Sequence, residues 1–245
     1  MTTAVNHRSL WGCGLLALAL AWCQGPYAAS AEEKEIAKIA KPGPLTGDLA
    51  GVATIVVPAK YRFIPKDNIK RFNDLTQNLT SPTECGVVLP PGDADWYILF
   101  AYTGEGYIKD SDKGKIDAAA LLKAMQEREK EVNKQRTKQK IPTVELTGWE
   151  QPPRFDDKTK TLSWGLKLLS DKQTGINYNA RILGRAGYMS ANLVVAPEDF
   201  KKVLPEYTKI MDGFAYKDGQ KYGDWKPGDK VAPVGLQVLI GGTAK

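Results

Sequence analysis

The second half of this 245-residue chain alternates hydrophobic and polar positions, which is the pattern of β-strands that bury one face. Segments 144–149, 161–169, 176–183 and 188–195 are short and apolar, and turn residues separate them. This spacing predicts antiparallel strands, the last three connected as a meander. The residues expected to point inward from the first meander strand are Leu162, Trp164, Leu166 and Leu168.

The first half contains shorter apolar runs. Residues 52–57 and 61–64 flank the turn Pro-Ala-Lys, so we predict that they form a β-hairpin. Residues 67–77 place apolar side chains at helical spacing and predict a short helix. Segments 86–90 and 96–102 are apolar and aromatic, with Pro, Gly and Asp at their ends, and predict two further strands.

Two longer segments have helical periodicity. Residues 117–140 begin with Asp117, a good N-cap, and carry an apolar stripe. Residues 197–211 predict a second helix, and a short edge strand follows at 214–216. Helices segregated from an antiparallel sheet predict an α+β fold, arranged as a two- or three-layer sandwich. We assign this single domain to residues 52–228.

The N-terminus has the features of a secretory signal peptide. Basic residues precede an apolar run at 10–23 that is too short to span a bilayer, and small residues lead to an expected cleavage site after Ala31. We therefore assign residues 1–31 to a signal peptide and 32–51 to a leader segment. The alternatives are a lipid anchor on Cys23 and an uncleaved N-terminal anchor.

Composition excludes several chemistries. The chain has 34 Lys+Arg against 28 Asp+Glu, and its single His lies within the predicted signal peptide. Removal of that peptide leaves Cys85 as the one cysteine, which excludes His-dependent catalysis and His- or thiolate-ligated metal sites. No nucleophile or phosphate-loop motif occurs, so we predict no metal and no cofactor. The export signal and mild charge argue against a nucleic-acid partner.

Three carboxylates lie in or beside the Pro-rich segment 151–160, which we predict to be a turn. Glu150, Asp156 and Asp157 are candidates for an acid–base pair, as glycan hydrolases require. The alternative is that Asp156 and Asp157 belong to a hairpin turn, in which aspartate is a preferred residue.

A row of polar side chains follows two strands of the predicted meander. Asn177, Asn179 and Arg181 share one strand face, and Ser190 and Asn192 lie on the neighbouring strand. Amide, guanidinium and hydroxyl groups in such a row can bind a polar ligand or a partner surface. The alternative is an ordinary solvated sheet face.

Several stretches, in order along the chain, resemble one protein family. They are YRFIP (61–65), DADWYILFAY (93–102), GYIKD (106–110), GWEQPPRFDDKTKTLSW (148–164), NYNARILGRAGYMSANLV (177–194), KYGDW (221–225) and DKVAPVGL (229–236). Over most of its length the chain resembles domain-of-unknown-function family 2167, a group of bacterial membrane-anchored envelope proteins. The order of elements is also similar, at the level of fold, to the sandwich of the PsbP and Mog1 proteins.

The resemblance implies a location rather than a chemistry. Members of the family have a signal peptide and a C-terminal hydrophobic anchor, without an established activity. It implies a protein on the periplasmic face of the bacterial inner membrane, with residues 229–245 as a juxtamembrane tail leading to an anchor absent from this chain. We expect a non-catalytic binding or accessory module for an envelope protein or a membrane-surface partner. The alternative is a carboxylate-based hydrolase of cell-wall or polysaccharide material.

Overall fold

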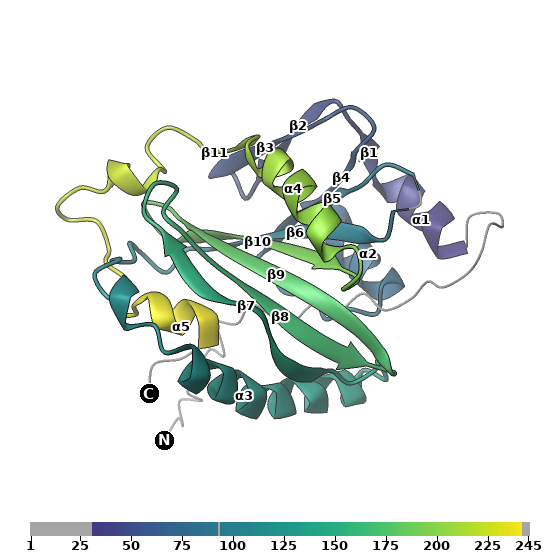
Figure 1. The fold of residues 1–245 in the computed structure, drawn as a ribbon. Coiled ribbons are helices and arrows are strands. Elements are labelled where there is room, and N and C mark those ends of the chain that lie inside the picture. The colour runs from purple at the N-terminus through teal and green to yellow at the C-terminus, as the bar shows by residue number, and fades with distance from the viewer. Residues whose placement is uncertain (1–30, 93, 242–245) are drawn as a thin grey trace, which may run out of the picture.

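The computed structural model describes residues 31–92 and 94–241, and the predicted signal peptide lies outside them except for Ala31. These residues form two antiparallel sheets (Figure 1). The large sheet consists of β1 (Lys41–Pro42), β4 (Arg62–Pro65), β5 (Glu84–Leu89), β6 (Trp96–Thr103), β7 (Glu145–Asp156), β8 (Thr161–Ser170), β9 (Gln173–Leu183) and β10 (Tyr188–Val195). The small sheet consists of β2 (Leu45–Leu49), β3 (Ala53–Val57) and β11 (Phe214–Tyr216). Their strand orders are β1-β4-β5-β6-β10-β9-β8-β7 and β11-β3-β2.

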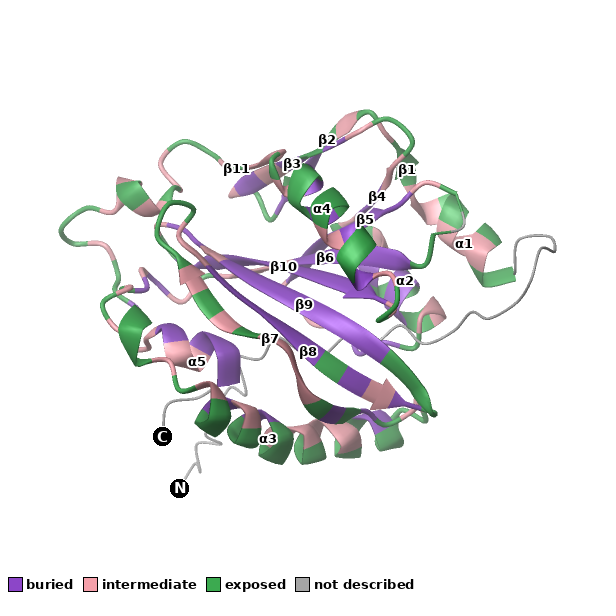
Figure 2. Ribbon diagram, viewed as in Figure 1, coloured by how far each residue is buried: buried purple, intermediate pink, exposed green. Residues whose placement is uncertain are grey.

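The predicted meander is confirmed. Strands β8, β9 and β10 pair in succession, and β10 then pairs with β6 at the centre of the sheet. The side chains expected to point inward from β8 are all buried, because helices cover that face of the sheet. Figure 2 shows that β9 and β10 are buried over most of their length.

The helices are α1 (Ala31–Ile39), α2 (Ile69–Leu75), α3 (Ala118–Lys138), α4 (Phe200–Met211) and α5 (Leu236–Gly241). The start of α3 is the predicted one: the Asp117 carboxylate accepts hydrogen bonds from the backbone N–H groups of Ala119 and Ala120, both at 3.0 Å. These two donors have no partner within the helix, so the cap fixes its first turn.

The elements form three layers, with the large sheet in the middle (Figure 1). One face of this sheet, the small-sheet face, carries Phe100 and Leu193 and packs against α4 and the small sheet around one apolar cluster. The opposite face, the helix face, carries Leu99 and Trp164 and packs against α2, α3 and α5. The expected α+β sandwich is therefore present, in its three-layer form.

Two local predictions in the strands are wrong. The runs 52–57 and 61–64 do not form a hairpin, because β3 pairs with β2 and β11 in the small sheet while β4 pairs with β1 and β5 in the large one. Both runs are short and mostly apolar, so their pattern does not show which strands they pair with. The predicted Pro-rich turn 151–160 is a turn only at 157–160, because residues 151–156 are the second half of β7. This strand tolerates Pro152 and Pro153 because it is an edge strand with several register shifts.

The two ends of the domain also differ from the prediction. The predicted leader contributes α1, β1 and β2, and Leu49 is fully buried. Part of the predicted tail forms α5, in which Leu236 is fully buried and its N–H donates to the Asp112 carboxylate at 3.1 Å. Both segments are short and interrupted by Gly or Pro, so their structure depends on tertiary burial. No helix within 31–92 or 94–241 is long and apolar enough to cross a membrane.

Candidate functional site

The strand register brings the predicted polar row together on the helix face. Asn179 lies opposite Asn192, and Arg181 lies opposite Ser190. We call Asn177, Asn179, Arg181, Ser190 and Asn192 the polar strip. All five are only 3–8% exposed, whereas their alternation with apolar residues predicted either an exposed surface or a solvated face.

The polar strip separates two apolar clusters. On one side, Trp164 and its neighbours pack beneath α3 and α5. On the other, Leu99 and its neighbours pack beneath α2. The pairing places Leu99 and Trp164 on the same rung as Asn179 and Asn192, directly beside them in the sheet. The strip is therefore a line of hydrogen-bonding groups through an otherwise apolar layer.

Arg181 is the charged member of the strip. Its Nη1 donates to Asn192 Oδ1 at 2.9 Å and to the Ala180 carbonyl at 3.4 Å, and its guanidinium carbon lies 4.9 Å from the centre of the Trp164 ring. The same carbon also lies 5.8 Å from the centre of the Tyr188 ring, and the Nε–H of Arg181 has no hydrogen-bond partner among the described residues. Burial lowers the pKa of Arg181, but the delocalised guanidinium group keeps its positive charge in proteins.

A second buried arginine was not identified from the sequence. Arg136, near the end of α3, is 2% exposed and donates to the carbonyls of Pro142 and Gln77, while its Nη1 has no partner. It lies near the phenol of Tyr97, which accepts a hydrogen bond from Asn78 at 3.1 Å. Arg136 follows Val132 by four residues and so falls on the apolar stripe of α3. That position was the signal for its burial.

Neither buried arginine has a carboxylate partner among the residues described. Within this part of the chain, Glu84 is the one buried carboxylate, and it accepts a hydrogen bond from Asn73 Nδ2 at 2.8 Å. Burial raises the pKa of Glu84 to about 7. The interior of the helix face thus contains more positive than negative charge.

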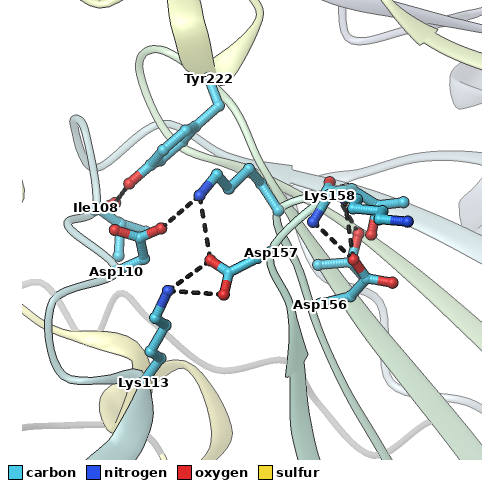
Figure 3. A network of polar contacts seen from close by, with 10 residues as sticks. Ile108, Asp110, Lys113, Asp156, Asp157, Lys158 and Tyr222 are labelled. Atoms are coloured by element: carbon cyan, nitrogen blue, oxygen red, sulfur yellow. Dashed lines mark hydrogen bonds and ion pairs between the residues drawn. The ribbon is translucent and has the colours of Figure 1, made fainter.

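Two of the three candidate acid–base carboxylates, Asp156 and Asp157, are hydrogen-bonded to lysines and to backbone N–H groups (Figure 3). Both Asp157 oxygens accept from Lys113 Nζ, at 2.6 and 2.7 Å, and Lys160 bridges Asp157 to Asp110. Asp156 accepts from the backbone N–H groups of the turn that follows it, at 2.8 and 3.2 Å. These hydrogen bonds lower the pKa values of both aspartates, so neither is prepared to donate a proton near neutral pH.

Glu150 is also far from the two aspartates. It lies six residues before Asp156 in β7, which corresponds to roughly 20 Å along a regular strand and somewhat less with the bulges. Its carboxylate lies 3.3 Å from Lys167 Nζ. Glycosidase carboxylates are about 5–10 Å apart, so the structure does not assemble Glu150 with either aspartate into such a pair. The described residues also contain no group of three His, Cys, Asp or Glu side chains that could hold a metal ion.

Comparisons with known proteins give a family and a distant structural neighbour. No curated protein matches the sequence. The chain is similar to the solution structure of cyanobacterial PsbP (CyanoP) from Synechocystis sp. PCC 6803, with 15% identity and a TM-score of 0.44, over 81% of this chain and 99% of that one. Residues 41–245 match the family described as protein of unknown function (DUF2167), and the chain belongs to that family.

Proposed function

We propose that this protein is a non-catalytic binding or accessory module of the bacterial cell envelope, and that its ligand or partner contacts the polar strip. The observation that carries the proposal is Arg181, a buried guanidinium which, within the part of the chain that the structure describes, has no hydrogen-bond partner for its Nε–H and no carboxylate partner. A buried donor without a partner costs free energy, about 1–3 kcal/mol and more when it is charged. A ligand that reaches this group would recover that cost.

The proposed location rests on the sequence. The basic, apolar and small-residue segments of residues 1–31 are typical of an exported protein. Family resemblance adds attachment to the periplasmic face of the inner membrane through a C-terminal anchor of the full-length form. An envelope protein or a membrane-surface molecule is then the expected partner. The hydrolase alternative has no supporting observation, since its three carboxylates are paired or distant from one another.

In-cell cross-linking of the tagged full chain tests the proposal. The variant Asn179→Leu keeps the approximate volume of the strip residue and removes its amide. The matched control is Ser163→Ala, which alters a buried polar residue of the same sheet on its opposite face. Circular dichroism verifies that both variants are folded.

We expect mass spectrometry to identify one species attached to wild type and to Ser163→Ala, and at least tenfold less of it on Asn179→Leu. Equal capture by all three proteins would place the binding surface elsewhere. No species specific to this protein, compared with a control exported domain, would contradict the module function itself.

A further inference from the structure

The charges inside the domain are unbalanced, and all of them lie on one side of the large sheet. Among the described residues, the buried charged groups are Arg136, Arg181 and Glu84. All three belong to the helix face, because Glu84 contacts Asn73 of α2 and Arg136 is part of α3. Neither arginine has an ion pair with a described residue, so residues 31–92 and 94–241 leave this layer with an excess of buried positive charge.

The guanidinium of Arg181 is buried, and one of its edges contains a nitrogen without a hydrogen bond to a described residue. Its Nη1 is held by Asn192 and the Ala180 carbonyl, and the ring of Trp164 packs against its plane. On the remaining edge, the Nε–H has no hydrogen bond among the described residues, and Tyr188 lies beside the guanidinium with its ring centre 5.8 Å from the guanidinium carbon. This edge presents two parallel N–H groups, and such a pair matches the two oxygens of a carboxylate or phosphate.

The surroundings of this edge are suited to an anion. Ser190 lies opposite Arg181 in β10 and contributes a hydroxyl donor to the same face. The amides of Asn179 and Asn192 add polar groups on the next rung. Helix α3 packs along β7 and α2 packs along β5, on the two sides of the strip. The carboxylate of Glu84 is bound to Asn73 and does not serve as the counter-ion of Arg181.

We infer that the polar strip is an oxyanion site, in which the ligand presents a carboxylate or phosphate group to the Nε edge of Arg181. This inference rests on the proposed function, because it names the chemical group by which the strip recognises its ligand. A lipid headgroup and a free anion offer the same chemistry at this edge, so the experiment separates them.

The test measures the Tm of the purified protein in chloride, in inorganic phosphate and in acetate, at equal pH and ionic strength. Phosphate stabilises many proteins without a specific site, so the result is the difference between variants. Arg181→Met removes the charge at nearly constant length. The matched control is Arg71→Met, which removes a guanidinium that is 53% exposed.

At ten times Kd, we expect phosphate or acetate to raise the Tm of wild type and Arg71→Met by about 3–6 °C more than that of Arg181→Met. If Arg181→Met does not fold, Arg181→Lys provides the same test, because it keeps the charge but loses the paired donors and should retain less than half of the shift. Equal shifts in wild type and the Arg181 variants, or no shift in wild type relative to chloride, would overturn the inference.

A further comparison identifies the source of the anion. Dihexanoyl phosphatidic acid, below its micellar concentration, is titrated beside inorganic phosphate. A larger Arg181-dependent shift with the lipid assigns the site to a headgroup, and equal shifts assign it to a free anion. If neither anion binds but cross-linking still depends on Asn179, the proposed function holds and the oxyanion inference fails. If the anion binds but no partner is captured, the oxyanion inference holds and the proposed function fails.

Discussion

The two faces of the large sheet are buried to a similar degree but composed differently. On the small-sheet face, one continuous cluster of apolar and aromatic side chains packs against α4 and the small sheet. Two of its tyrosine hydroxyls have partners: the buried Tyr207 donates to the Ala191 carbonyl at 3.2 Å, and the partly buried Tyr216 donates to the Ile182 carbonyl at 2.7 Å. The helix face has two clusters divided by the polar strip, and it contains the unpaired arginine atoms.

This difference suggests different contributions from the two faces: the small-sheet face to stability, and the helix face to the proposed ligand binding. A face without buried charge contributes stability through apolar burial alone. A face with incompletely bonded charged groups gives up part of that stability, and a ligand can restore it. The comparison can be tested by changing one group on each face and measuring the free energy of unfolding.

The largest expected effect is on the small-sheet face. Phe100 is fully buried there, and Phe100→Ala removes a ring from a closely packed layer. We expect the free energy of unfolding to fall by about 3–5 kcal/mol in a denaturant titration. The Asn179→Leu variant, on the helix face, serves as the comparison. A loss as large in Asn179→Leu as in Phe100→Ala would show that both faces contribute equally to stability.

The second expected effect concerns Glu84. Burial raises its pKa from 4.5 to about 7, so the folded state binds the proton more tightly than the unfolded state. Stability is therefore full below about pH 4.5, decreases as the pH rises, and is lowest above pH 7, by up to about 3 kcal/mol. In Glu84→Gln this decrease should disappear, because the amide does not ionise and still accepts from Asn73. Urea titrations between pH 4 and pH 8 measure the free energy of unfolding. If this free energy falls with pH as steeply in Glu84→Gln as in wild type, the decrease comes from other groups.

The smallest effect is expected for Arg181→Met without an anion present. Replacement of an uncompensated buried charge by an apolar side chain is often neutral or stabilising. In phosphate-free buffer we therefore expect the free energy of unfolding of Arg181→Met to be about 1 kcal/mol higher than that of wild type. A decrease of more than about 2 kcal/mol would mean that the contacts of Arg181 with Asn192 and Trp164 are structural. The buried groups of the helix face would then stabilise the fold without a ligand, as those of the small-sheet face do.

The sequence predicted the meander well because its strands are consecutive and each has a regular period of two. It failed for β3, whose partner β11 lies about 160 residues later and leaves no trace in the local pattern. The alternation placed the five strip residues on one face of the sheet, as the register shows, but did not predict their burial. An alternating strand is usually solvated on its polar side, whereas here α2, α3 and α5 pack against that side from distant parts of the chain. Arg136 was missed because a basic residue near a helix end is usually exposed.

The sequence of the edge strand β7 affects how copies of this domain associate at high local concentration. An open sheet edge is a template on which another chain can add a strand, and such addition leads to aggregation. Pro152 and Pro153 remove two successive N–H donors from β7, and its bulges interrupt the repeat that an incoming strand would have to match. Many copies of this domain can therefore crowd together without one sheet extending into the next at this edge.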